Sequence, residues 1–224
     1  MPTAFLEPDR SLAGERFFLR PWRALLLGAA LLLLFVLLAL LVPDQPLAIE
    51  QHWADWMREI QTPLLKQIAL VFNYLGRGLG RALVVVGVGV VPIVAKRWWA
   101  LLAYAVTEAL TPLLNSLFKA LVDRARPPDG LVHPSGPSFP SGHVSFAAAT
   151  LVAAVLLFTT VECPRRRWWW LATTGIVGMA WSRTYLQVHW LLDVLAGSFL
   201  GAGIALVVFA TIQLPRRAQT LQDE

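Results

Sequence analysis

A short polar stretch between two apolar runs carries the residue types that could do chemistry. Residues 182–193 read Ser-Arg-Thr-Tyr-Leu-Gln-Val-His-Trp-Leu-Leu-Asp, so they include Arg183, His189 and Asp193. His189 and Asp193 are four residues apart, and on a helix they would share a face and could hydrogen-bond. Ionisable groups beside a membrane-spanning run are costly and by default mark a functional site. The alternative is a helix-end cluster that only anchors the segment at a membrane interface.

Two further polar clusters precede this stretch. One holds Lys119, six further residues and then Arg126, and the other is Pro-Ser-Gly-His at 140–143. Arginine offers planar bidentate donors and lysine a compact positive charge, which suit the negative charge of a phosphoryl group in transfer. Ser141 and Gly142 at a helix start would present backbone N–H groups to an anion. The simpler interpretations are snorkelling of the cations to headgroups and an ordinary N-cap at Ser141.

The two histidines are the candidates for the reaction itself. Neutral His189 could attack phosphorus if Asp193 accepted the hydrogen of the other ring nitrogen and so fixed the tautomer. His143 could give a proton to the departing alkoxide and later take one from water. A zinc ion held by His143, His189 and Asp193 is the alternative. Two arginines and a lysine nearby would repel a cation, so we expect no metal ion and no other cofactor.

The composition indicates what must position these residues. The chain has 224 residues, 57% hydrophobic and 15% charged, with a mean hydropathy of +0.59. Several apolar runs approach the roughly 20 residues that cross a bilayer core of about 30 Å. The net charge of +5 comes from basic residues dispersed at helix ends, which fits membrane orientation and not a nucleic-acid partner. We therefore expect an all-α, polytopic membrane protein.

The apolar runs predict a bundle of six membrane-spanning helices. A helical spacing of apolar residues over roughly Leu47–Leu75 adds an amphipathic helix that lies in the membrane interface after the first span. Between Gly76 and Arg81 we expect a flexible turn, whose glycine spacing fits neither a dinucleotide fingerprint nor a P-loop and so predicts no phosphate cradle. The six spans are expected at about residues 24–42, 82–95, 98–119, 141–160, 168–185 and 188–213.

This layout makes one transmembrane domain, residues 24–213, between cytoplasmic tails at 1–23 and 214–224. Six spans put both termini on one side, and the lysine, arginine and tryptophan positions favour the cytoplasmic side. The same count places all three polar clusters at the outer face. Within the third span, Glu108, Thr111, Asn115 and Lys119 recur every three or four residues and predict a polar stripe that faces the bundle interior.

Taken together, the three clusters resemble the signatures of the type 2 phosphatidic acid phosphatase family of integral-membrane lipid phosphatases. The matching residues are Lys119 with Arg126 and Pro127; Pro140, Ser141, Gly142 and His143; and Ser182, Arg183, His189 and Asp193. The resemblance implies that His189 is the nucleophile of a phosphohistidine, that Asp193 orients it and that His143 is the general acid. It further implies that Lys119, Arg126, Ser141, Gly142 and Arg183 bind phosphate without a metal.

The resulting hypothesis is a plasma-membrane enzyme whose active site on the outer side hydrolyses a lipid phosphate or diphosphate. Family-level candidate substrates are undecaprenyl diphosphate, phosphatidic acid and phosphatidylglycerol phosphate, and the residues do not choose among them. A lipid phosphotransferase using the same phosphohistidine is the first alternative. A transporter would instead distribute charges along several helices and show inverted repeats. A silent lipid-phosphate-binding protein is the third alternative, and the intact pair of histidines argues against it.

Overall fold

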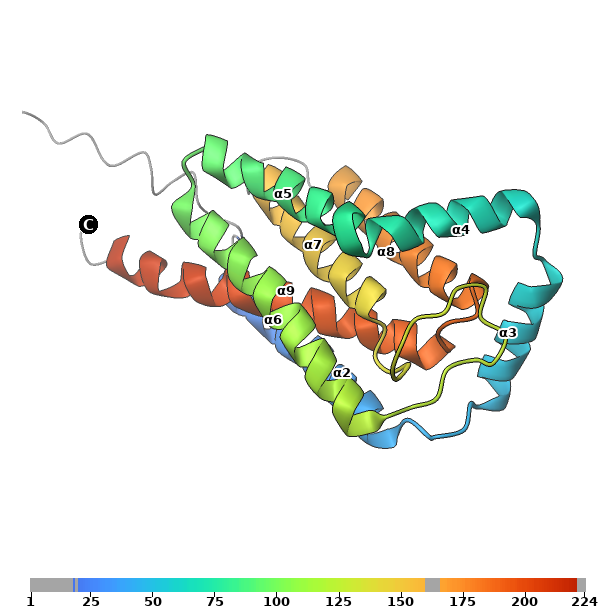
Figure 1. Ribbon diagram of the computed structural model, residues 1–224. Coiled ribbons are helices and arrows are strands. Elements are labelled where there is room, and N and C mark those ends of the chain that lie inside the picture. The colour runs from blue at the N-terminus through green and yellow to red at the C-terminus, as the bar shows by residue number, and fades with distance from the viewer. Residues whose placement is uncertain (1–17, 19, 160–165, 221–224) are drawn as a thin grey trace, which may run out of the picture.

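The chain folds into a bundle of helices, with one shorter helix lying across an end of it (Figure 1). The computed structural model describes residues 18, 20–159 and 166–220, with side chains to residue 214. Within these residues every regular element is a helix, which confirms the all-α prediction. The helices are α2 (Pro21–Leu41), α3 (Ala48–Glu59), α4 (Pro63–Leu75), α5 (Gly78–Val94), α6 (Trp98–Val122), α7 (Gly142–Phe158), α8 (Arg166–Tyr185) and α9 (Leu191–Thr220).

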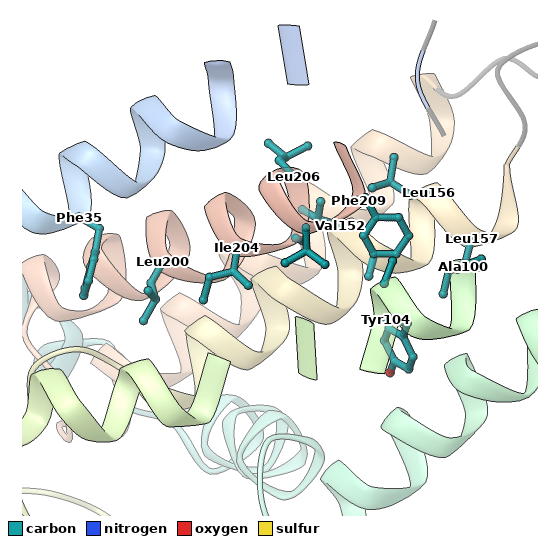
Figure 2. Close-up of a cluster of buried hydrophobic side chains, with 14 of the residues drawn as sticks. Phe35, Ala100, Tyr104, Val152, Leu156, Leu157, Leu200, Ile204, Leu206 and Phe209 are labelled. Atoms are coloured by element: carbon teal, nitrogen blue, oxygen red, sulfur yellow. The ribbon is translucent and has the colours of Figure 1, made fainter. Parts of the chain in front are cut away.

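Helix α9 is the element around which the others pack, because it contacts α2, α6, α7 and α8. The core between them is apolar and includes Phe35 of α2, Tyr104 of α6, Val152 of α7, and Leu200 and Phe209 of α9 (Figure 2). All five side chains are at most 5% exposed. Burial of this apolar surface fixes the positions of the helices that carry the polar clusters.

Helices α7 and α9 approach each other backbone to backbone. A Cβ atom at Gly201 of α9 would lie 2.1 Å from the carbonyl oxygen of Ser145 and 2.8 Å from the amide of Ala149 on α7. Only glycine allows this approach, as at the small-residue interfaces of membrane helices.

The outer surface is strongly apolar, as expected of helices that face lipid. Leu40, Leu41 and Val94 are each about three-quarters exposed. Three of the described helices, α2, α6 and residues 191–214 of α9, are long and apolar enough to cross a membrane, and α4 with α5 would make a fourth if this pair, bent by 63°, is one span. Helix α7 is apolar but has only 17 residues. The full count of six spans remains a prediction.

The three polar clusters lie at the same end of the bundle. Helices α2, α6 and α8 end there, and α7 and α9 begin there, beside α3 and the loop of residues 123–141 (Figure 1). The beginnings of α2, α6 and α8 lie at the other end, with Trp22, Trp98 and Trp170 at least half exposed. The relative positions of the clusters therefore follow from the alternating directions of the helices.

The segment after the first span differs from the single helix predicted over Leu47–Leu75. It forms two helices, because Thr62 caps α4 by accepting a hydrogen bond from the amide of Leu65 at 3.3 Å, and Pro63 follows at the first helical position. Only Gly76 and Arg77 separate α4 from α5, so the flexible turn expected up to Arg81 is largely the first turn of α5. The helix break at Thr62 and the start of α5 at Gly78 bring polar residues of this region to the bundle end where the three polar clusters lie.

The predicted tails fall mostly outside this description. Residues 1–17, 19 and 221–224 are outside the described residues, and so are residues 160–165 of the loop before α8. The described parts show that α2 begins at Pro21, inside the predicted tail of residues 1–23, and that α9 continues to Thr220, past the predicted end at residue 213.

Candidate active site

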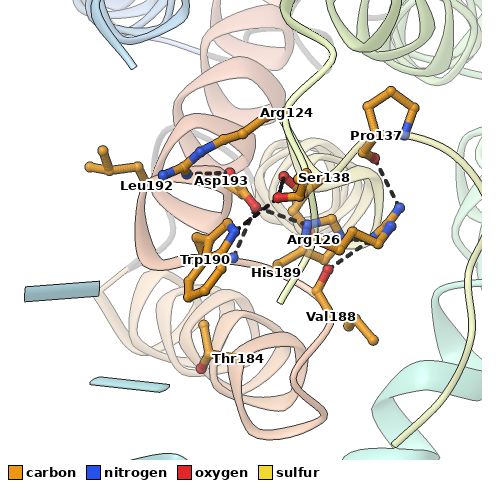
Figure 3. Close-up of polar contacts among 12 residues, drawn as sticks. Arg124, Arg126, Pro137, Ser138, Thr184, Val188, His189, Trp190, Leu192 and Asp193 are labelled. Carbon is orange, nitrogen blue, oxygen red and sulfur yellow. Dashed lines mark hydrogen bonds and ion pairs between the residues drawn. The ribbon is translucent and has the colours of Figure 1, made fainter. Parts of the chain in front are cut away.

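His189 and Asp193 form a pair at the start of α9. The prediction that both lie on one helix is wrong, because His189 lies in the turn between α8 and α9, and α9 begins only at Leu191. Asp193 caps this helix by accepting a hydrogen bond from the amide of Trp190 at 2.9 Å through Oδ2. The same oxygen lies 3.5 Å from Nδ1 of His189 (Figure 3). Capping therefore turns the carboxylate back toward the imidazole and brings the two together.

Arg126 lies at the other nitrogen of the same imidazole. Its Nη1 is 3.3 Å from Nε2 of His189 and donates to the carbonyl oxygen of Val188 at 2.7 Å. Further hydrogen bonds run to the carbonyl oxygen of Pro137 (Figure 3) and to that of Gly136, both at 2.9 Å. Arg126 also donates to the carbonyl oxygen of Ser135. Its guanidinium therefore makes four hydrogen bonds to backbone carbonyl oxygens, and all four would have to break for it to leave.

Lys119 and Arg183 complete the predicted set of cations. Lys119 Nζ donates to the carbonyl oxygen of Pro137 at 2.5 Å, so the loop of residues 123–141 holds this lysine as well as Arg126. Arg183, at the end of α8, is 1% exposed, and its Nη1 donates to Oδ1 of Asn73 at 2.8 Å. Its Nε has no hydrogen-bond partner among the described residues.

Ser141 joins the first turn of α7 to the first turn of α9. Its amide donates to the carbonyl oxygen of Asp193 at 3.0 Å, and its buried Oγ has no hydrogen-bond partner among the described residues. A buried polar atom without a partner costs free energy, and an anion beside the N-terminus of α7 could accept bonds from both Ser141 and Arg183. This end of α7 therefore has the character of an anion site.

The surroundings of His189 keep its imidazole neutral. Burial lowers its pKa well below the ordinary value of 6.5, and the positive charges of Arg126, Arg183 and Lys119 lower it further. At neutral pH the ring therefore carries one hydrogen and one lone pair. If Asp193 accepts the hydrogen of Nδ1, the lone pair is on Nε2, on the side of Arg126.

His143 begins α7 and contacts the region between α4 and α5. Its Nε2 lies 3.3 Å from the carbonyl oxygen of Asn73, and a Cβ at Gly76 would lie only 2.2 Å from its Cδ2. The ring is within electrostatic range of His189 and Arg183. Asn73 thus contacts two predicted site residues, although no motif in the sequence indicated it.

A second ionic cluster, also missed from the sequence, lies behind Asp193. Arg124 is fully buried and donates to Oδ1 of Asp193 at 2.9 Å and to both carboxylate oxygens of Glu50 at 3.2 and 2.7 Å. Glu50 also accepts from the amides of Leu192 and Leu47, both at 3.0 Å. Although burial opposes its charge, hydrogen bonds to Glu50 and the charge of Asp193 raise the pKa of Arg124. Both oxygens of Asp193 therefore accept hydrogen bonds, Oδ1 from Arg124 and Oδ2 from the amide of Trp190.

The predicted polar stripe of α6 does face the neighbouring helix α7. Glu108 Oε1 accepts a hydrogen bond from the hydroxyl of Thr150 at 2.6 Å, and the side-chain amide of Asn115 donates to the hydroxyl of Ser145 at 3.1 Å. Above them, a cavity of about 370 Å³ opens between α5, α6 and α7. Its lining consists of Gly76, Arg77, Gly78, Arg81, Thr111, Pro112, Asn115, Ser116, Lys119, Gly142, His143 and Phe146.

This arrangement can bind a tetrahedral dianion and attack it. The structure brings together a neutral imidazole, a carboxylate oxygen 3.5 Å from its Nδ1, three cations and the start of a helix. No three His, Cys, Asp or Glu side chains of the described residues form a group that could hold a metal ion. His143 does not form such a group with His189 and Asp193, and its Nε2 lies 3.3 Å from the carbonyl oxygen of Asn73.

Comparisons with known proteins identify the family of this chain. A family model described as the PAP2 superfamily matches residues 100–217, just over half of the chain. Phosphatidylglycerophosphatase B of Bacillus subtilis (strain 168) is 31% identical over 150 residues, which are 63% of this chain and 72% of that protein.

Two solved structures have a similar fold. The first transmembrane PAP2-type phosphatidylglycerolphosphate phosphatase from Bacillus subtilis matches with a TM-score of 0.69 and 28% identity, over 81% of this chain and 93% of that chain. Aquifex aeolicus LpxE shares the fold, with a TM-score of 0.60 and 19% identity over 75% of this chain and 96% of that chain. The chain therefore belongs to the PAP2 superfamily, and it is a membrane lipid phosphatase.

Proposed function

We propose that this phosphatase hydrolyses a lipid phosphate or diphosphate through a phosphohistidine on His189, without a metal ion. The observation that carries the proposal is the environment of one ring: Asp193 lies at Nδ1, Arg126 at Nε2, and burial with three cations keeps the imidazole neutral. A neutral imidazole with a fixed tautomer is a nucleophile, and cations beside it offset the negative charge of an approaching phosphate.

In the first step, Nε2 of His189 attacks phosphorus, and the bond from phosphorus to the leaving oxygen breaks. Lys119, Arg126, Arg183, the hydroxyl of Ser141 and the backbone amide of Gly142 bind the three equatorial oxygens, where transition-state charge collects; the amide of Ser141 is already bonded to the carbonyl oxygen of Asp193. His143 gives a proton to the leaving oxygen, so that the lipid alcohol or lipid monophosphate departs uncharged at that atom.

In the second step, water attacks the phosphohistidine, and His143 takes a proton from that water. The bond from phosphorus to Nε2 breaks, its electron pair returns to the imidazole, and inorganic phosphate is released. Asp193 stabilises the ring through both steps by accepting the Nδ1 hydrogen, while Arg124 donates to its other oxygen.

The proposed setting is a six-span bundle in the plasma membrane with both termini in the cytoplasm and the site at the outer face. Support comes from the clustering of the site residues at one bundle end and of the exposed Trp22, Trp98 and Trp170 at the other. Helices α3 and α4 would then lie against the outer face beside the site. Phosphatidylglycerol phosphate is a candidate substrate because the curated relative and a matching solved structure are named for it; undecaprenyl diphosphate and phosphatidic acid are the others.

The decisive experiment is phosphate release by purified protein in detergent, comparing wild type with His189→Ala. We expect the variant to release phosphate at least ~10³-fold more slowly, because no other group is placed to attack. His133→Ala, at an exposed histidine of the loop, is the matched control and should retain wild-type activity. Wild-type rates in His189→Ala would refute the mechanism.

A lipid phosphotransferase is the second candidate, because an alcohol could resolve the same phosphohistidine in place of water. Product analysis separates the two. With a lipid phosphate labelled in its phosphate and an added alcohol acceptor, a hydrolase gives labelled inorganic phosphate, whereas a transferase gives labelled acceptor. An acid-quenched reaction should in either case trap label on the protein, and Asp193→Asn should reduce the rate at which it forms.

A further inference from the structure

The cavity between α5, α6 and α7 continues the site on the side of His143. Its lining includes His143, Gly142 and Lys119, and also Arg77, which precedes α5, and Arg81 in the first turn of α5. His189, Arg126 and Arg183 are not part of its lining. At about 370 Å³ it has the volume of roughly a dozen waters, which is more space than the phosphate under attack requires.

The lining of this cavity is cationic and carries no carboxylate. The cations of the lining are Lys119, Arg77 and Arg81, and none of the lining residues is Asp or Glu. Among the described residues neither Arg77 nor Arg81 forms an ion pair; Arg81 instead lies over the ring of Phe146, at 4.7 Å from its centroid. Glu108 is within electrostatic range of Arg81, but it does not line the cavity and is bound by Thr150. Cations that form no ion pair favour an anion beside them.

The start of α5 adds to the positive potential. Gly78 lines the cavity, and the first intrahelical bond here runs from the amide of Arg81 to the carbonyl of Arg77. The amides of residues 78–80 therefore lie before the hydrogen-bond ladder begins, where the helix dipole is positive. The bend of 63° between α4 and α5 places this helix end beside His143.

We propose that this cavity is a second anion subsite, in which Arg77 and Arg81 bind a phosphate group that stays on the lipid after cleavage. The inference rests on the proposed function, because His143 as general acid identifies this side as that of the leaving group. A leaving group with its own phosphate matches two lipid types: a diphosphate, which leaves as the lipid monophosphate, and a phosphomonoester whose leaving group contains a phosphodiester. Phosphatidic acid, which leaves as an uncharged diacylglycerol, would not use the subsite.

For a diphosphate the step balances as follows. His189 Nε2 bonds to the terminal phosphorus, and the bond from that phosphorus to the bridging oxygen breaks. The electron pair stays on the bridging oxygen, which takes a proton from His143 and leaves as part of the lipid monophosphate. Arg77 and Arg81 hold the inner phosphate throughout, so they favour an anion that remains anionic in the product.

The test is a selectivity ratio measured with purified full-length protein in detergent. Substrates are phosphatidic acid, phosphatidylglycerol phosphate and undecaprenyl diphosphate, and the variants are Arg77→Gln, Arg81→Gln and their combination. A charge-assisted hydrogen bond of this kind corresponds to roughly a 10-fold change in affinity or rate. We expect kcat/KM for at least one two-phosphate substrate, divided by that for phosphatidic acid, to fall about 10-fold in each single variant and further in the double variant.

The matched control is Lys66→Gln, which removes an exposed cation from α4 and should leave the ratio unchanged. A fall for undecaprenyl diphosphate identifies an inner phosphate as the ligand, and a fall for phosphatidylglycerol phosphate identifies a phosphodiester. Equal losses on all three substrates, or no loss on any, would overturn the subsite. A wild-type protein inactive on every lipid phosphate would overturn the proposed function instead.

A binding measurement keeps the subsite testable even then. In His189→Ala, calorimetry should show inorganic diphosphate binding at least ~10-fold more tightly than inorganic phosphate, since it can reach both anion positions. The preference should disappear when Arg77→Gln and Arg81→Gln are added. Equal affinity for the two anions in His189→Ala, with Arg77 and Arg81 intact, would count against the subsite. Size-exclusion chromatography checks that each variant remains folded.

Discussion

Replacement of Arg124 by methionine should damage both the stability and the catalytic rate of this protein. Methionine has a similar length but no charge, so Arg124→Met leaves the carboxylates of Glu50 and Asp193 buried without their shared cation. All three side chains are fully buried, with 0% side-chain exposure. Removing one partner from a buried ionic cluster typically costs about 3–5 kcal/mol, because the remaining charge is not compensated.

The size of the effect can be read from thermal unfolding in detergent. A loss of this size should lower Tm by on the order of 10 °C for a chain of this length. Arg58→Met is the matched control, because Arg58 pairs with Asp55 where the side chains are 41% and 54% exposed, and its further hydrogen bond to Oε1 of Gln187 is long, at 3.4 Å. An exposed pair contributes at most about 1 kcal/mol, so its Tm should change little.

Two further measurements separate this account from a general loss of packing. In the double variant with Glu50→Gln, one of the two uncompensated carboxylates is gone, so Tm should lie above that of Arg124→Met alone. At temperatures where Arg124→Met is still folded, kcat should fall more than KM rises, because Asp193 no longer keeps its charge beside His189. The reasoning is refuted if Arg124→Met and Arg58→Met lower Tm equally, or if the double variant is less stable than both singles.

Three other predictions concern the reaction. Because burial and neighbouring cations lower the pKa of His189, the ring stays neutral as pH falls through 6.5, and the acid limb of a kcat/KM profile should have its midpoint well below that pH; a midpoint at or above 6.5 would contradict the neutral nucleophile. Gly76→Ala should lower kcat about 100-fold or more, because the new Cβ displaces the ring of His143. Gly87→Ala is the control, because a Cβ there meets open space, and its kcat should be unchanged. Equal rates in the two variants would show that His143 takes no part in the reaction. Phosphate release should persist in excess chelator, and its abolition would show that a metal ion takes part.

The end of the bundle at which the site lies could be predicted from the sequence, because the direction of each successive helix follows from counting apolar runs. That count placed Lys119, His143 and His189 together, and the structure has their helix ends at one end of the bundle. Local capping was harder to anticipate. Because Asp193 caps α9 through the amide of Trp190, His189 lies before the helix begins. The spacing of four residues between His189 and Asp193 instead predicts that both lie on the helix.

The contacts that join distant segments could not be predicted. Glu50 meets Arg124 across 74 residues of sequence, and Asn73 meets Arg183 across 110. Neither pair has a spacing or a periodicity, because each depends on how α3 and α4 fold back over the bundle end. The signal that was available, Thr62 followed by Pro63, marks the helix break that makes this fold-back possible.

The backbone contact at Gly201 has a consequence for how substrate choice can change in this family member. It fixes the spacing between α7, which carries the proposed proton donor, and α9, which carries the carboxylate behind the proposed nucleophile. Because no larger residue fits at Gly201, a substitution there cannot be used to change the distance between α7 and α9 at the reaction centre. An engineer who wishes to retarget the enzyme should leave α7 and α9 untouched and build a mutant library across α3, α4 and the first turn of α5.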